Sequence, residues 1–157
     1  MATRRHDTGR PEDAIEMLRA DHQKVRELFQ DYEAAQDQRA KRKIAQQIFV
    51  ELETHAQLEE SVFYPAFKQE ADPAGKQLVT ESLEEHQQVK ELIEELRELD
   101  ADDETFDAKF HELMEQVEHH VEEEENEMLP EAELALAEQA EDLMDEMQEV
   151  KRQLLTS

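Results

Sequence analysis

FDAKFHELMEQVEHHVEEE, residues 106–124, is the stretch that indicates how this chain folds. Its apolar residues recur at alternating steps of four and three, the spacing of one buried helix face. They are Phe106, Phe110, Leu113 and Val117. The same steps lead on to His120 and then to Glu124. The pattern predicts a packed helix whose core-facing stripe changes from apolar residues to a histidine and a carboxylate.

The composition of the whole chain favours helices. Of its 157 residues, 5% are aromatic and only 2 are glycine, while strong helix formers such as Glu, Gln, Leu, Ala and Lys dominate. The length suits one domain. Amphipathic segments follow one another with short breaks between them. We therefore expect an all-α, up-down-up-down four-helix bundle with an additional C-terminal helix.

The breaks in the pattern set the expected boundaries. We expect a flexible N-terminal arm at residues 1–10, the bundle at 11–132 and a C-terminal amphipathic helix at 133–157. The basic stretch 39–43 is predicted to mark the turn after the first helix and the restart of the second, and Pro65 predicts a bend or an early end in the second. The C-terminal helix could pack on the bundle or on a partner, including self-association with a second copy.

The two halves of the expected bundle repeat each other. The first half carries DHQKV at 21–25 and THAQLEE at 54–60, and the second carries EHQQV at 85–89 and HHVEEEE at 119–125. Equivalent histidines lie 64 residues apart in the first pair and 65 in the second. A repeat that preserves four histidines in equivalent places indicates a shared role.

The helical stripes place six polar residues of this repeat in the core. Each helix has one inward histidine, and two helices add a glutamate one turn later. The set is His22, His55, Glu59, His86, His120 and Glu124. In the third helix the expected stripe passes through Leu83. Unpaired buried charge is costly, so we favour a bound cation as the explanation. The alternative is that the inward histidines and glutamates satisfy one another.

The other polar residues near these motifs are predicted to face solvent. They are His6, His111, His119, Glu60, Glu122, Glu123 and Glu125. Glu51 lies one turn before His55, and the sequence leaves open whether it or His119 adds a ligand. The ring of Tyr64 is expected to serve packing.

Imidazole and carboxylate donors together suit iron, manganese or zinc rather than calcium. Six such donors fit two ions and leave open coordination positions, which water, an oxo or hydroxo bridge, dioxygen or nitric oxide could fill. The chain has no cysteine, which excludes thiolate ligation and disulfides. Its net charge of -26 disfavours nucleic-acid and anionic membrane partners. With no signal peptide and no long apolar run, we expect a cytoplasmic protein.

With these motifs, residues 12 to 132 resemble the hemerythrin-like HHE cation-binding family. The resemblance implies a non-haem centre of two iron ions in the bundle core, oxo- or hydroxo-bridged, with the six residues as ligands. Lys90 departs from the oxygen-carrying hemerythrins, which have a histidine there, and Glu124 replaces an Asp at a different spacing. The carboxylate-rich set is more similar to the hemerythrin-like domain of the iron-sensing F-box protein and to many bacterial homologues.

The sequence leaves three functions open. The first is binding or sensing of dioxygen, nitric oxide or iron itself, and we expect this one because no separate catalytic acid, nucleophile or substrate pocket is visible. The second is an enzyme that detoxifies peroxide or nitric oxide at the same centre. The third is a metal-free helical interaction module that uses the C-terminal helix.

Overall fold

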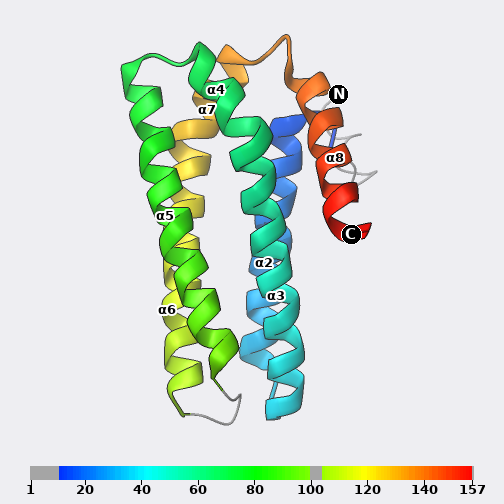
Figure 1. Ribbon diagram of the computed structural model, residues 1–157, viewed down its shortest axis with the longest axis vertical. Helices are drawn as coiled ribbons and strands as arrows, with labels where there is room; N and C mark the ends of the chain where they lie inside the picture. The colour runs from blue at the N-terminus through cyan, green and yellow to red at the C-terminus, as the bar shows by residue number, and fades with distance from the viewer. Residues whose placement is uncertain (1–10, 100–103, 157) are drawn as a thin grey trace.

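A computed structural model describes residues 11–99 and 104–156, so the arm expected at 1–10 lies outside the described residues. Figure 1 shows four long helices side by side, joined as an up-down-up-down bundle. They are α2 (Ala14–Ala34), α3 (Gln38–Leu58), α5 (Pro73–Glu98) and α6 (Glu104–Glu123). The all-α prediction is confirmed. Within the described ranges, no helix combines the length and the apolar character that crossing a membrane requires.

Aspartate caps fix where the helices begin. The Asp13 carboxylate accepts a hydrogen bond from a backbone N–H at the start of α2, and Asp37 does the same for α3. Asp72 caps α5, which starts with a proline. The basic stretch 39–43 lies at the restart of the helix, as expected, but the turn itself comes earlier, because Asp37 caps α3 and the helix begins at Gln38.

The second and fourth helices continue through their prolines. Each passes through one π-helical turn into a short helix: η1 (Glu59–Phe63) into α4 (Tyr64–Glu70), and η2 (Glu124–Met128) into α7 (Leu129–Ala135). A proline lacks an N–H and its ring crowds the carbonyl four residues earlier. In η1 the N–H of Tyr64 instead bonds to the Glu59 carbonyl, five residues back, and this wider turn accommodates Pro65.

The apolar core consists of two clusters with a polar layer between them. Along α2, for example, Leu18 belongs to the first cluster and Val25 to the second, and the buried His22 lies between them. Phe63 and Phe67 stack in the first cluster, and Phe110 of the second stacks on Tyr32. Burial of these apolar side chains stabilises the bundle on both sides of the layer.

One core position of α5 differs from the sequence prediction. Leu83 is 43% exposed, whereas Ser82 is only 6% exposed. Either residue fits the three- and four-residue steps of the stripe, so periodicity alone cannot choose between them. The inward side chain is the small hydroxyl, which lies beside the phenol of Tyr64.

The C-terminal helix α8 (Ala140–Thr156) packs along α2 on the outside of the bundle (Figure 1). It begins later than expected, because Leu136 leaves the helical backbone after α7 and a turn follows. Leu143 and Met147 are buried in the first apolar cluster. Self-association through this helix stays a prediction, and it would use the exposed Leu154 and Leu155 at the end of α8.

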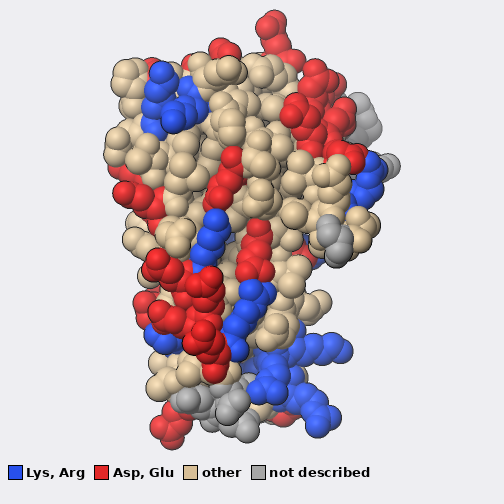
Figure 2. Space-filling model, viewed as in Figure 1, with Lys and Arg blue, Asp and Glu red and all other residues tan. Residues whose placement is uncertain are grey.

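Most charged side chains lie on the outer surface. Figure 2 shows acidic groups gathered over the lower half of α5 and basic groups near the start of α3. Surface carboxylates of this kind are well solvated and need no partner. The charged groups that do need an explanation are therefore those inside the polar layer.

Candidate metal centre

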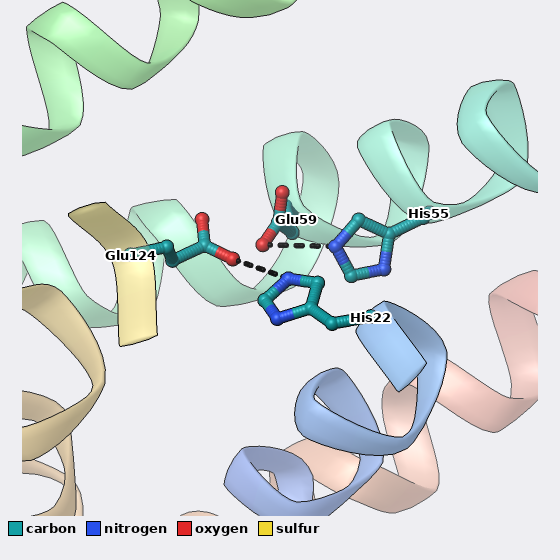
Figure 3. Close-up of side chains that lie close together, drawn as sticks. All are labelled: His22, His55, Glu59 and Glu124. Atoms are coloured by element: carbon teal, nitrogen blue, oxygen red, sulfur yellow. Dashed lines mark hydrogen bonds and ion pairs between the residues drawn. The ribbon is translucent and has the colours of Figure 1, made fainter. Parts of the chain in front are cut away.

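The six residues singled out from the sequence meet in the polar layer, where none is more than 9% exposed. Figure 3 shows four of them pointing toward one another. His22 comes from α2 and His55 from α3, while Glu59 and Glu124 are the first residues of the two π turns. The alternating stripe turns these side chains inward, as predicted.

The donors form two groups that share one carboxylate. In each group the ligand atoms lie within 4.8 Å of one another. The larger group is His22, His55, Glu59 and Glu124, and the smaller is Glu59, His86 and His120. The histidines pair accordingly, with ring centroids 4.9 Å apart in both pairs. The arrangement offers two neighbouring positions for a cation, joined by Glu59.

Every histidine presents the same nitrogen to the centre. Each Nε2 faces a carboxylate of Glu59 or Glu124, and each Nδ1 faces outward. The inner distances are 3.0 Å for His22 to Glu124, 3.2 Å for His55 to Glu59, 3.0 Å for His86 to Glu59 and 3.4 Å for His120 to Glu124. Each inner glutamate thus touches one histidine of each pair.

These contacts leave buried atoms unsatisfied. Among the described residues, His55 Nε2, His120 Nε2 and Glu59 Oε2 have no hydrogen-bond partner. His55 Nε2 and Glu59 Oε2 are close, but they are not aligned for a hydrogen bond. The inner histidines and glutamates therefore do not satisfy all of one another's hydrogen-bonding atoms. A cation between these atoms would satisfy them, and imidazole nitrogen with carboxylate oxygen is a donor set that suits iron.

Without a cation, protons balance the buried charges. Burial alone lowers the pKa of His120, but the facing carboxylate of Glu124 and the hydrogen bond to Glu85 raise it to about 10. Burial alone raises the pKa of Glu124, yet the neighbouring Glu59 carboxyl and the facing histidines His120 and His22 hold it well below its usual range. Imidazolium and carboxylate thus stabilise each other. A bound metal ion takes the place of these protons, so its binding releases them.

Residues 13–132 match the model of the family described as the hemerythrin HHE cation binding domain. The chain belongs to this family. It is 32% identical over 119 residues to an uncharacterised hemerythrin-like protein of Schizosaccharomyces pombe. That match covers 76% of this chain but only 59% of the yeast relative. Its fold resembles the crystal structure of a hemerythrin HHE cation binding domain-containing protein from Mycobacterium kansasii, with a TM-score of 0.74 and 22% identity, over 92% of this chain and 90% of that one.

In this hemerythrin-like chain, four outer carboxylates hold the outward Nδ1 atoms of the histidines. The pairs are His22 with Glu125 at 2.7 Å, His55 with Asp21 at 2.9 Å, His86 with Glu60 at 2.7 Å and His120 with Glu85 at 2.6 Å. Such bonds fix the tautomer and the orientation of a ligating imidazole. Each outer carboxylate belongs to a different helix or turn from the histidine that it holds.

The sequence prediction was wrong for Glu60 and Glu125, which were expected on a solvated face. Both side chains are partly buried, at 23% and 20% exposure, and each holds a histidine. The repeat contained the signal, because both glutamates directly follow an inner glutamate. The helical period predicts that both side chains point away from the core. Each carboxylate nevertheless reaches a histidine on a neighbouring helix.

Lys90, where oxygen-carrying hemerythrins have a histidine, supports the centre indirectly. Its amino group lies 3.3 Å from Glu60, the carboxylate that holds His86. In the other half Arg26 lies 3.6 Å from Glu125, which holds His22. Both cations come four residues after the histidine of their own helix. A basic residue, an outer carboxylate and a histidine thus form the same chain of contacts in both halves.

The structure also places residues that the sequence left open. Glu51 pairs with Lys24 at 3.0 Å, and His119 is 68% exposed, so neither lies with the six inner donors. Tyr64, expected to serve packing, brings its hydroxyl into the centre. It donates to Glu124 Oε2 at 2.6 Å and lies 3.0 Å from Glu59 Oε1. The π turn explains this, because residues five apart share a face there.

Replacing Asp21 with alanine should weaken iron binding by about 10- to 100-fold, the usual effect of losing a carboxylate that orients a histidine ligand. The Asp21 carboxylate accepts a hydrogen bond of 2.9 Å from Nδ1 of His55. Asp21→Asn should restore part of the affinity, since its carbonyl oxygen can still accept from Nδ1.

Titration against a competing chelator measures the change. Glu53→Gln is the matched control, because Glu53 pairs with Arg97 on the surface. Equal affinity in Asp21→Ala and the parent protein would show that this bond does not orient the imidazole.

Proposed function

We propose that this chain is a non-haem di-iron protein that binds or senses a small ligand: dioxygen, nitric oxide or iron itself. The main support for this proposal is the pair of donor groups that share Glu59 in the buried layer. Three of their donor atoms lack a hydrogen-bond partner among the described residues. His22, His55, Glu59, His86, His120 and Glu124 would hold the two ions. Bound iron would supply a redox-active Lewis acid with coordination positions left open.

A small cavity beside the histidines supports a small uncharged ligand. Its volume is about 40 Å³, and all four inner histidines line one side of it. The rest of the wall is mainly apolar and includes Val25, Leu52, Val89, Ile93, Val117 and Val121. One water needs about 10–15 Å³ on this scale, so the cavity has room for a small molecule such as dioxygen, nitric oxide or peroxide. The apolar wall also disfavours charged ligands and water at this side of the centre.

A second candidate is an enzyme that detoxifies peroxide or nitric oxide at the same centre. Groups that could pass protons lie close by, because outer carboxylates are hydrogen-bonded to the inner histidines His55 and His120. We favour binding or sensing over the enzyme, because binding needs only the centre itself, whereas peroxide or nitric oxide turnover also needs groups that take part in catalysis.

Metal analysis with absorption spectroscopy tests the proposal. We expect about two irons per chain, as in other helix-bundle carboxylate centres, and a spectral change on adding nitric oxide or dioxygen. His120→Ala should abolish that change, whereas the exposed His119→Ala should preserve it.

Peroxide consumption measured on the same samples separates the two candidates. Turnover by the parent protein that His120→Ala abolishes would support the enzyme. Absence of turnover together with the spectral change would support binding or sensing. A protein that takes up no iron would contradict both.

A further inference from the structure

The cavity beside the histidines reaches the surface between α3 and α5. Among the residues that line it, all those from α2 and α6 are buried. The lining residues that are not buried come from α3 and α5, and they are Glu53, Ala56, Val89 and Lys90. These two helices lie at the front of the bundle in Figure 1, so the opening is on the face that Figure 2 shows.

The internal repeat shows how this opening arises. The equivalent side of the bundle lies between α6 and α2, where Val121 takes the place of Ala56. Val121 is only 5% exposed, whereas Ala56 is partly exposed. Valine carries two methyl groups more than alanine, and they fill the space that alanine leaves free. The cavity is therefore open on one of two equivalent sides.

The Lys90 side chain is held at the opening. It is 43% exposed and also lines the cavity, so its methylene chain forms part of the wall while its amino group reaches solvent. That amino group lies 3.3 Å from Glu60 in η1, which continues α3. Glu60 is fixed in turn by its bond of 2.7 Å to His86. The ion pair thus spans from α5 to the continuation of α3 beside the opening.

We propose that small uncharged ligands reach the centre through this opening, and that the Lys90 side chain determines how fast they pass. The inference rests on the proposed function, since it concerns the ligand of the same centre. Partly exposed ion pairs such as Lys90 with Glu60 are weak, and exposed side chains change rotamer within picoseconds to nanoseconds. Entry therefore requires the movement of one side chain and no separation of the helices.

Stopped-flow mixing of the iron-loaded protein with nitric oxide measures entry. Lys90→Ala shortens the wall at the opening and should raise the association and dissociation rate constants several-fold. Ala56→Leu fills the opening from α3 and should lower both. Because a ligand crosses the same barrier on its way in and out, each variant should change the two rate constants by the same factor and leave the equilibrium affinity unchanged.

Arg26→Ala is the matched comparison. Arg26 is the equivalent of Lys90 in the other half and lies 3.6 Å from the outer carboxylate of Glu125, but it is not among the residues that line the cavity. Its replacement measures what the loss of a cation beside an outer carboxylate does by itself. Lys90→Ala should accelerate entry well beyond Arg26→Ala, and equal acceleration in the two variants would overturn the role of Lys90.

Xenon gives a readout that needs no iron, because apolar cavities in proteins take up this gas. Xenon NMR on the metal-free protein measures how fast the bound gas exchanges with solvent. We expect faster exchange in Lys90→Ala than in Arg26→Ala, and slower exchange in Ala56→Leu than in the parent protein. Should Ala56→Leu not fold, the other two variants decide the question.

The two measurements separate this inference from the proposed function. Nitric oxide and xenon rates that are the same in all variants would overturn the entrance and leave the di-iron centre intact. A change in the nitric oxide dissociation rate alone would also overturn it, because Lys90 would then act on the bound ligand. A parent protein without iron would overturn the proposed function, while xenon exchange would still show whether the cavity is entered between α3 and α5.

Discussion

Glu124→Gln should reduce bound iron from about two ions per chain to fewer than one, with the affinity falling at least about 100-fold, beyond the usual loss from a merely supporting residue. Glu124 touches one histidine of each pair, His22 at 3.0 Å and His120 at 3.4 Å. An amide of the same shape removes one donor oxygen from the position at His22 and His55, and it removes the negative charge that faces His120 at the other position. The side chain is 1% exposed, so water cannot replace what is lost.

Iron analysis after dialysis measures this effect, and circular dichroism checks that the helices remain. Glu122→Gln is the matched control, because Glu122 is exposed two residues earlier on the same stretch of helix. Wild-type iron content in Glu124→Gln would show that Glu124 is not a ligand.

Removing iron should lower the melting temperature by about 10 °C. A ligand present at 1,000 times its dissociation constant contributes about 4 kcal/mol, and about 1 kcal/mol shifts the melting temperature of a chain of this size by about 2–4 °C. The structural reason lies in the three buried donor atoms without a hydrogen-bond partner among the described residues, at His55, Glu59 and His120. Bound iron would satisfy them, and without it their charge would be balanced only by protons.

Thermal melting followed by circular dichroism, before and after treatment with a chelator, tests this prediction. Adding iron back should restore the higher melting temperature in the parent protein but not in Glu124→Gln. An unchanged melting temperature after iron has demonstrably been removed would mean that the buried layer is stable without a cation.

Much of the fold and the inner donor set could be predicted from the sequence, because a helix has a fixed period. Steps of three and four residues carry the stripe from Phe110 through Val117 to His120 and Glu124, so their inward direction follows from local geometry. The repeat identified the equivalent residues of the other half. The helical period and the repeat can both be read from the sequence without knowing how the helices pack. The structure brings all six residues together in the buried layer.

Periodicity failed where two residues fit the stripe equally well or where the helix changes its period. Ser82 and Leu83 both fit the steps of α5, and only packing against Tyr64 selects the serine. Tyr64 itself faces the centre because a π turn, wider than an α-helical turn, intervenes between Glu59 and the phenol. A regular α-helical pattern misplaces any residue beyond such a turn.

Local spacing along the chain is enough to predict the helical class, the inward histidines and glutamates, and the exposure of His119. The tertiary structure alone decided which groups surround those donors. Asp21, Glu60, Glu85 and Glu125 reach histidines on other helices, 26 to 103 residues away along the chain. Contacts of that range are fixed by how the helices pack, which no local period encodes.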